Sequence, residues 1–214
     1  MKKWEDLIRL KESGLVAVIR KPKASQIHAI AEALVKGGVG ALEITVDTPG
    51  AIPMITSLKE TFEDRVLVGA GTVLDAESAK AAIDAGADFI FSPILDVETI
   101  QLTNRYGKIS IPGVMTPTEV VQAYSAGADL LKVFPGDSLG IDYIKNLRGP
   151  LPHIPMMPTG GVSLNNVEAF IKSGAVAVGA GGTLVDKKAI DEERYEVLTD
   201  IAREFIKRIK NARG

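Results

Sequence analysis

The chain contains no cysteine, which excludes disulfide bonds, thiolate metal ligands and cysteine nucleophiles. Histidine is almost as scarce, because His28 and His153 are the only two, and neither has the spacing of a metal ligand around it. The chain also lacks a Walker-type phosphate loop and a Gly-x-Gly-x-x-Gly sequence after its first strand, and it offers no Ser-His-Asp set. We therefore expect neither a metal ion nor a bound cofactor.

The chain also has no large excess of charge of one sign and no long hydrophobic run. The 214 residues carry 25 Lys and Arg against 27 Asp and Glu, a net charge of −2, with no long run of either sign. This balance argues against nucleic acid or a membrane surface as a partner. The charged start, residues 1–10, has no apolar core of signal-peptide length, and no segment has the length of a transmembrane helix. We expect a cytoplasmic protein.

What the chain does have is a recurring pattern, in which a short apolar run is followed by a turn and a helix-length segment that often ends at glycine. The apolar runs are Leu15–Ile19, Ala41–Thr45, Val66–Gly69, Phe89–Phe91, Ile109–Ile111, Leu130–Phe134, Ile154–Pro158 and Val176–Gly179. The helical segments between or after them are 24–36, 50–61, 75–85, 96–105, 117–126, 139–147 and 163–173. Strands that alternate with helices predict a parallel sheet with crossover helices.

Eight such strands predict an α/β fold, a single (β/α)₈ TIM barrel over residues 1–214, because no Ser- or Gly-rich linker divides the chain. A doubly wound sheet is the main alternative, since strand order cannot be read from one sequence. Two more helices flank the unit at about 2–13 and 191–211. Trp4, Leu7 and Ile8 share one face of the first, so we expect an N-terminal helix that caps the bottom of the barrel.

Lys132 ends an apolar run in the stretch Asp129-Leu-Leu-Lys132-Val-Phe-Pro-Gly136. A lysine inside a buried strand is costly to keep charged, so its pKa should fall, and a lysine of low pKa forms Schiff bases with carbonyl compounds. The alternative is a lysine just past the strand that reaches solvent. With a side-chain period of two, Lys132 shares its face with Leu130 and Phe134.

Glu43 lies in a second apolar run, Ala41–Thr45, and shares its face with Ala41 and Thr45 at the two ends of that run. Burial would raise its pKa toward the range of a general acid/base. The alternative is a structural ion pair with Lys132 or Arg20. Because parallel barrel strands end at the same rim, Glu43 and Lys132 can meet in one cavity, where an amine and a carboxylate suffice for Schiff-base aldol chemistry.

Further candidates follow the ends of other expected strands. Pro158-Thr-Gly-Gly161 and Gly179-Ala-Gly-Gly182 follow the seventh and eighth strands, where barrels often bind phosphate through backbone N–H groups, although either pair of glycines can be a plain turn. Arg20 ends the first strand and can clamp a carboxylate or pair with Glu43. Gly69-Ala-Gly-Thr72 and Phe91-Ser-Pro93 end the third and fourth strands.

These motifs together resemble the 2-keto-3-deoxy-6-phosphogluconate / 2-keto-4-hydroxyglutarate aldolases, in the same order along nearly the whole chain. They are Val-Ala-Val-Ile-Arg20, Leu-Glu43-Ile-Thr, Gly-Ala-Gly-Thr72-Val, Phe-Ser-Pro93, Pro-Gly-Val-Met-Thr-Pro, Leu-Lys132-Val-Phe-Pro and Pro-Thr-Gly-Gly161.

The resemblance implies a class I aldolase that works as a homotrimer on a small-molecule keto acid. It makes Lys132 the Schiff-base lysine and Glu43 the general acid/base. The residues it implies around pyruvate are Thr72, Pro93 and Phe134, and those for phosphate and hydroxyl groups are Thr159, Gly160 and Gly161.

Two positions depart from the family pattern. Asp47 stands where many members have a substrate-binding arginine, and Gly182, followed by Thr183, stands where a serine often helps to hold phosphate. Arg20 could take over the substrate carboxylate, and the amides of Gly181 and Gly182 could still bind phosphate. The departures leave the preferred 2-keto-4-hydroxy acid open. The remaining alternatives are another phosphate-binding barrel enzyme, such as an epimerase or thiamin phosphate synthase, and a non-catalytic keto-acid-binding barrel.

Overall fold

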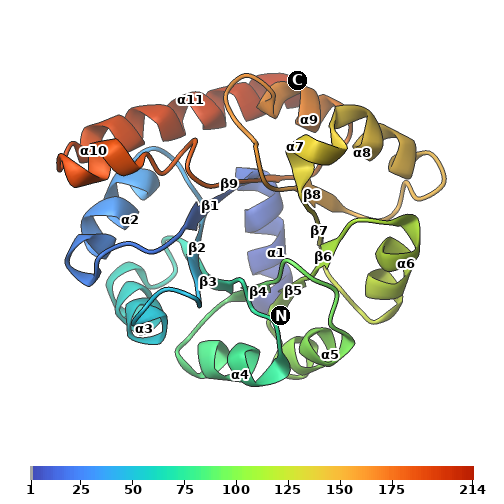
Figure 1. The fold of residues 1–214 in the computed structure, drawn as a ribbon, viewed down its shortest axis with the longest axis horizontal. Helices are drawn as coiled ribbons and strands as arrows, with labels where there is room; N and C mark the ends of the chain where they lie inside the picture. The colour runs from blue at the N-terminus through green and yellow to red at the C-terminus, as the bar shows by residue number, and fades with distance from the viewer. Residues whose placement is uncertain (1) are drawn as a thin grey trace.

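The computed structural model describes residues 2–214 as a ring of parallel strands surrounded by helices (Figure 1). The strands are β1 (Leu15–Ile19), β2 (Ala41–Thr45), β3 (Leu67–Gly71), β4 (Phe89–Phe91), β5 (Ile109–Ile111), β6 (Gly113–Val114), β7 (Leu131–Val133), β8 (Met156–Pro158) and β9 (Val178–Ala180). The helices are α1 (Lys2–Ser13), the 3₁₀ turn η1 (Ala24–Gln26), α2 (Ile27–Lys36), α3 (Ala51–Phe62), α4 (Ala76–Asp84), α5 (Val97–Arg105), α6 (Pro117–Ser125), α7 (Gly136–Leu139), α8 (Ile141–Arg148), α9 (Val167–Lys172), α10 (Lys187–Asp191) and α11 (Tyr195–Arg213).

The strand pairing closes the sheet into a barrel. Six strands pair in the order β5-β4-β3-β2-β1-β9, and β6, β7 and β8 form a second group in that order. The bridge between Thr159 and Gly179 joins β8 to β9, and the N–H of Asp129 donates to the carbonyl of Ser110 at 3.1 Å across the other junction. The first and last strands are neighbours, so the predicted TIM barrel is confirmed and the doubly wound sheet is wrong.

The fifth barrel strand carries two labels because Pro112 interrupts it between β5 and β6. Proline has no N–H and cannot donate to a neighbouring strand. Its carbonyl still accepts from the N–H of Lys132 at 2.9 Å, so the ladder continues across the break. The prediction of Ile109–Ile111 was therefore right but too short.

Two separate apolar clusters hold the barrel together. The larger lies between the strands and the surrounding helices, where crossover helices bury one face. The smaller fills the lower interior of the barrel with side chains from inward-facing strand positions and from α1. Its buried members are Leu7, Leu10, Val16, Ala41, Leu67, Phe89, Phe91, Ile109, Ile111, Leu130, Met157 and Ala177.

Helix α1 lies across the middle of the ring and closes its lower end (Figure 1). Leu7 and Leu10 of this helix belong to the inner cluster, so the expected cap is confirmed. The predicted capping face was wrong in part, because Trp4 and Ile8 are 61% and 56% exposed. The buried face of the helix contains Leu7 and Leu10, three residues apart, and Trp4 and Ile8 lie together on one side of it.

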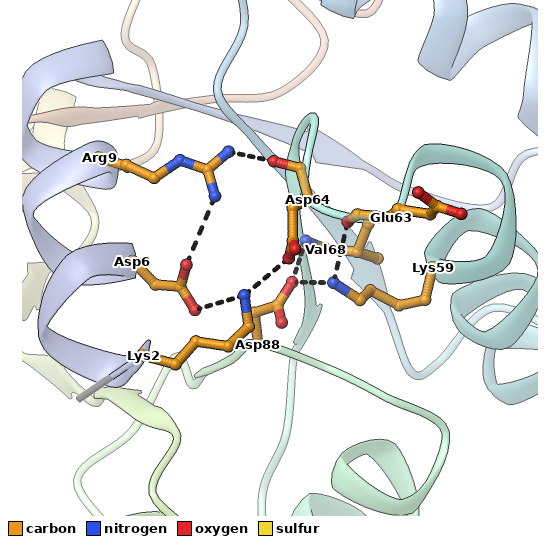
Figure 2. Close-up of polar contacts among 8 residues, drawn as sticks. All are labelled: Lys2, Asp6, Arg9, Lys59, Glu63, Asp64, Val68 and Asp88. Atoms are coloured by element: carbon orange, nitrogen blue, oxygen red, sulfur yellow. Dashed lines mark hydrogen bonds and ion pairs between the residues drawn. The ribbon is translucent and has the colours of Figure 1, made fainter.

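Polar contacts tie α1 and the neighbouring loops to the lower end of the sheet (Figure 2). Lys2 pairs with Asp64 at 2.7 Å, and the Arg9 guanidinium donates to the Asp64 carbonyl at 2.5 Å. In the same region the buried carboxylate of Asp88 pairs with Lys59 at 2.7 Å and accepts from the Val68 N–H at 3.0 Å. The lower end is therefore a structural end of the barrel.

Several element boundaries differ from the prediction. The third strand runs to Gly71 instead of ending at Gly69, because parallel pairing with β2 continues as far as Thr45. The expected helix 139–147 is two helices, α7 and α8, which separate at Gly140, where φ is +82°. The expected helix at about 191–211 is α11, which begins later, at Tyr195, and runs to Arg213, while the short helix α10 before it was not expected. Within residues 2–214, no helix is both long enough and apolar enough to span a bilayer.

Candidate active site

Lys132 lies in the middle of β7 with its side chain directed into the barrel above the inner cluster. The period-two pattern accounts for this, because Leu130 on the same face belongs to that cluster. The Lys132 side chain is buried, with the residue 5% exposed, and its Nζ lies 4.3 Å from the ring centre of Phe91 and 4.7 Å from that of Phe134. The alternative of a lysine that reaches bulk solvent is wrong.

Burial lowers the pKa of Lys132 because the ammonium form loses its hydration. The negative charge of Glu43 opposes this shift, and the positive charge of Arg20 adds to it. Among the described residues no carboxylate lies at ion-pairing distance from Lys132, so the opposing effect of the Glu43 charge does not outweigh that of burial. A larger share of neutral amine, the nucleophilic form, follows.

Glu43 occupies the inward face of β2 and is only 1% exposed. Burial raises its pKa to about 7, although the charges of Lys132 and Arg20 act in the opposite direction. Its Oε2 has no hydrogen-bond partner, and within residues 2–214 no basic group lies at ion-pairing distance from it. The structural ion pair is therefore absent, and the carboxyl group is placed to exchange a proton near neutral pH.

Glycine on the neighbouring strand makes room for this carboxylate. A Cβ atom on Gly71 would lie 1.6 Å from Glu43 Oε1 and 2.2 Å from its Cδ. On the opposite side of the barrel, a Cβ on Gly179 would lie 2.4 Å from Thr159 Oγ1. Thr159 is buried and its hydroxyl also lacks a partner. The upper interior thus contains two unpartnered polar groups in space that glycines leave free.

Arg20 lies at the end of β1, but its partner is Asp47 instead of Glu43. Its Nη1 lies 3.0 and 3.1 Å from the two Asp47 oxygens, and its Nη2 donates to Thr72 Oγ1 at 3.1 Å. Thr72 adopts the left-handed φ of +58° directly after β3. The side chains of Arg20, Asp47 and Thr72 thus form one hydrogen-bonded group at the rim. Asp47, which stands where many family members have arginine, occupies the guanidinium of Arg20 that was expected to bind the substrate carboxylate.

Pro93 and Phe134 lie together beside a surface hollow of about 560 Å³. Phe134 is 37% exposed, so its ring both contacts Lys132 and reaches the rim. Gly113 of β6 allows a close approach of strands, because a Cβ there would lie 2.3 Å from the backbone carbon of Pro93. Thr72, Pro93 and Phe134 therefore lie just beyond the carboxyl ends of β3, β4 and β7, and Phe134 follows its strand where the sequence analysis had included it in the strand.

The glycine loops divide into two groups. Gly160 and Gly161 have φ of +92° and +67°, and a Cβ on Gly161 would lie 2.3 Å from an Asp137 carboxylate oxygen. Gly182 has nothing within 4 Å of its Cβ position, and together with Gly181 it lines a cleft shared with Arg20. The loop with Gly181 and Gly182 is therefore open, whereas the Asp137 carboxylate lies against the loop with Gly160 and Gly161.

Sequence reasoning missed several residues that shape the site. Gly71 and Gly179 are visible in the sequence at inward positions, but what they contact depends on the facing strand. Asp137 follows Pro135 and Gly136 in the sequence, yet only the fold brings it to Gly161. Among residues 2–214, no group of three or more His, Asp or Glu side chains is arranged to hold a metal ion.

Comparison with known proteins assigns the chain to a family. The family described as "KDPG and KHG aldolase" matches residues 7–201. The 2-dehydro-3-deoxy-phosphogluconate aldolase of Haemophilus influenzae is 33% identical over 203 residues, which cover 94% of this chain and 95% of that protein.

Solved structures agree with this assignment. The KDPG aldolase of Legionella pneumophila, solved with pyruvate captured as a covalent carbinolamine, has a TM-score of 0.86 and 30% identity over 92% of this chain and 96% of that one. A cube-shaped cage designed by fusing symmetric oligomeric domains has a TM-score of 0.87 and 30% identity over 94% of this chain and 73% of that one. The chain belongs to the KDPG and KHG aldolase family, whose members are lyases that cleave carbon–carbon bonds.

Proposed function

We propose that this protein is a class I aldolase that cleaves a 2-keto-4-hydroxy acid to pyruvate and an aldehyde through a Schiff base on Lys132. The substrate is 2-keto-3-deoxy-6-phosphogluconate, 2-keto-4-hydroxyglutarate or both, and the aldehyde is glyceraldehyde 3-phosphate or glyoxylate accordingly. The observation that supports this most directly is that the barrel interior holds both a buried amine, Lys132, and a buried carboxyl group, Glu43, that has no ion-pair partner. The carbinolamine in the related Legionella structure supports it independently.

In the proposed mechanism, neutral Lys132 attacks the C2 ketone to give a carbinolamine, and loss of water leaves an iminium ion. Glu43 transfers the protons, directly or through a water molecule. The iminium accepts the electron pair of the C3–C4 bond while Glu43 removes the C4 hydroxyl proton, which releases the aldehyde and leaves an enamine. Protonation at C3 and hydrolysis then return pyruvate and free Lys132.

The test is to mix the protein with pyruvate and borohydride and to locate the modified residue by peptide mass spectrometry. We expect a reduced pyruvate adduct on Lys132, and in Lys132→Ala neither adduct nor turnover. Circular dichroism of the variant serves as the control for folding. A folded wild-type protein that forms no adduct would contradict the mechanism. Pyruvate binding without turnover of either substrate would instead support a non-catalytic keto-acid-binding barrel.

We also propose that the protein assembles as a homotrimer. Three large apolar side chains, Leu74, Ile94 and Met115, are exposed on loops that follow β3, β4 and β6, at the same rim of the barrel. Exposed apolar groups gathered in this way are typical of protein interfaces. The similarity to a domain in a cage designed from symmetric oligomeric domains is consistent with assembly. Native mass spectrometry should show three times the mass of one chain.

A cytoplasmic location is part of the same proposal, since an aldolase of this kind meets its keto-acid substrate there and the chain has no cysteine that would need an oxidising compartment. Cell fractionation with an antibody against the protein would check it, and recovery in the membrane or extracellular fraction would contradict it.

A further inference from the structure

A chain of hydroxyl groups joins the segments that follow β1 and β2. Thr45, the last residue of β2, and Thr48, in the turn after it, are both buried, and their Oγ1 atoms lie 3.1 Å apart. The Oγ1 of Thr48 accepts the backbone N–H of Lys21 at 3.0 Å. At the other end, the Thr45 hydroxyl donates a hydrogen bond to the Asp47 carboxylate. Two buried threonines therefore connect the segment after β1 with the carboxylate that pairs with Arg20.

The donors and acceptors of this chain fit a single direction. A threonine hydroxyl has one hydrogen to donate. Because the Thr45 hydrogen is used on Asp47, the hydrogen between the two threonines comes from Thr48. The Thr48 oxygen in turn accepts the Lys21 N–H. Each hydroxyl is thus used as a donor and as an acceptor, and the chain ends on a negative charge, where hydrogen bonds are strong.

Backbone strain is concentrated around the same chain. Among residues 2–214, the non-glycine residues with a left-handed φ are Lys21, Glu63, Thr72 and Glu193. Lys21, with φ of +50°, is held by the Thr48 hydroxyl. Thr72, a β-branched residue for which φ of +58° is costly, accepts from Arg20 Nη2 at 3.1 Å. Strained residues persist where their surroundings fix them, and they cluster at functional sites.

The Thr45 hydroxyl shares the charge of Asp47 with the cations of the rim. Burial acts to raise the pKa of Asp47. The Thr45 hydrogen bond, followed by the charges of Arg20 and Lys21, outweighs burial and lowers this pKa below its ordinary value. Without the hydroxyl, the Asp47 carboxylate would depend on the two cations alone, and its contact with the Arg20 guanidinium would tighten.

We propose that Thr45 is a positioning residue for substrate binding, whose hydroxyl limits the hold of the Asp47 carboxylate on the Arg20 guanidinium. The guanidinium can then turn to the carboxylate of a keto acid while it keeps its hydrogen bond to Thr72. Thr48 supports this role because it donates to Thr45. The proposal rests on the aldolase function proposed above, and it adds a residue that acts through Arg20 instead of on the reacting atoms.

The first experiment removes one hydroxyl group and keeps the shape of the side chain. In Thr45→Val we expect KM for 2-keto-4-hydroxyglutarate to rise about 3- to 10-fold, the scale of one hydrogen bond to a charged group, with kcat within about twofold of wild type. Thr45→Ser keeps the hydroxyl and should restore KM.

The matched control is Thr103→Val. It removes an equally buried hydroxyl, which donates to the Thr99 carbonyl within α5, on the outside of the barrel. We expect it to leave KM unchanged. An equal KM in Thr45→Val and Thr103→Val, or no recovery of KM in Thr45→Ser, would overturn the proposal.

The second experiment asks whether the effect passes through Asp47. In an Asp47→Ala background, Thr45→Val should leave KM unchanged, since the carboxylate on which the hydroxyl acts is gone. A rise in KM of the same size in both backgrounds would overturn the proposal, because Thr45 would then act on the fold in general.

The third experiment does not depend on catalysis. NMR of isotope-labelled protein can follow the titration of the Asp47 carboxyl carbon, with Asp47→Asn to identify its resonance. Loss of the hydrogen bond should raise the pKa of Asp47 in Thr45→Val but not in Thr45→Ser or Thr103→Val. If this rise is observed but pyruvate forms no adduct on Lys132 of the wild type, the aldolase proposal fails and the hold of Thr45 on Asp47 stands. A normal adduct with an unchanged pKa of Asp47 gives the opposite result and overturns the positioning role.

Discussion

Glu43 is buried with one carboxylate oxygen unpartnered, and its pKa is raised to about 7. Between its ordinary pKa, near 4.5, and about 7, the folded protein holds a proton that the unfolded chain releases. The Glu43 contribution to stability is therefore most favourable at low pH and declines as the pH rises through this window. Above about 7 the folded protein retains a buried, charged carboxylate, which is the least favourable state.

This predicts a pH-dependent effect of Glu43→Gln on the free energy of unfolding. Glutamine does not titrate, so the variant should gain stability relative to wild type by about 1–3 kcal/mol between pH 4 and pH 8. Urea unfolding at both pH values measures this difference. Glu98→Gln, at an exposed position of α5, is the control and should show no comparable change. A difference for Glu43→Gln that is flat with pH would contradict the raised pKa.

The same substitution tests the proposed proton transfer. Glu43→Gln should reduce kcat by about 10²–10⁴-fold, the usual contribution of a general acid/base, while pyruvate still binds at Lys132. Steady-state kinetics and borohydride trapping report the two quantities separately. Full activity in the variant would remove Glu43 from the mechanism.

The ion pair between Asp47 and Arg20 predicts an effect on substrate binding at the rim. Asp47→Asn removes the carboxylate that lies 3.0 Å from Arg20 and leaves a residue of the same shape. The freed guanidinium should bind an anionic substrate better, with KM lower by about 2- to 10-fold, as for one partly exposed charge pair. Kinetics with 2-keto-4-hydroxyglutarate would measure it, and an unchanged or higher KM would show that Asp47 does not restrain Arg20.

The residue positions of the site were largely predictable because the side-chain period of a strand is two. Lys132 and Glu43 are inward-facing in the structure for the same reason that the sequence suggested. The partner of Arg20 was not predictable in this way. Its ion pair with Asp47 joins two strand ends, and the choice between Asp47 and Glu43 depends on side-chain geometry in three dimensions.

At the level of elements, one polar contact recurs at the lower ends of two strands. Asp88 precedes β4, accepts from the Val68 N–H and pairs with Lys59. Asp129 precedes β7, accepts from the Ser110 N–H at 2.8 Å and pairs with Lys3 at 2.9 Å. Each aspartate follows Gly-Ala in the sequence, so the repeat was visible there, although its role was not. Each carboxylate satisfies a backbone donor where a strand begins.

This contact predicts a marked loss of stability in Asp88→Ala. The variant leaves the Val68 N–H and the Lys59 ammonium without their buried partner, which should cost about 2–4 kcal/mol. Asp64→Ala, in the same region of Figure 2, removes only an exposed ion pair and should cost much less. Urea denaturation of both variants measures the contrast, and equal losses would show that burial at Asp88 carries no special weight.

For the whole molecule, the alternation of strands and helices was enough to predict the barrel and its capping helix. Strand centres were right because apolar runs mark burial, and their ends were less accurate because pairing with a neighbour decides where a strand stops. Pro112 and Gly140 show what the sequence alone could not decide. Each is visible in the sequence at the point where an expected strand or helix is divided, but contacts with the neighbouring backbone determine whether the element continues beyond it.

Assembly is the prediction that belongs to this scale. Leu74→Glu and Met115→Glu place charges among the exposed apolar side chains of the upper rim and should convert the proposed trimer to monomers. Trp4→Glu is the matched control, since Trp4 is a large exposed apolar side chain at the opposite end of the barrel. Light scattering after size exclusion measures the mass. Monomeric wild type, or a dissociated Trp4→Glu, would contradict the proposed interface.

The glycines that face into the upper barrel have a consequence for how this protein can change. The chamber around Glu43 and Thr159 exists because Gly71 and Gly179 present no Cβ atom there. Glycine is the smallest residue, so every substitution at these positions makes the chamber smaller and none enlarges it. A lineage that drifts toward bulkier substrates therefore has to find the room elsewhere, in the rim loops or at aromatic residues beside Lys132 such as Phe134, while these two wall positions can change only toward a narrower chamber.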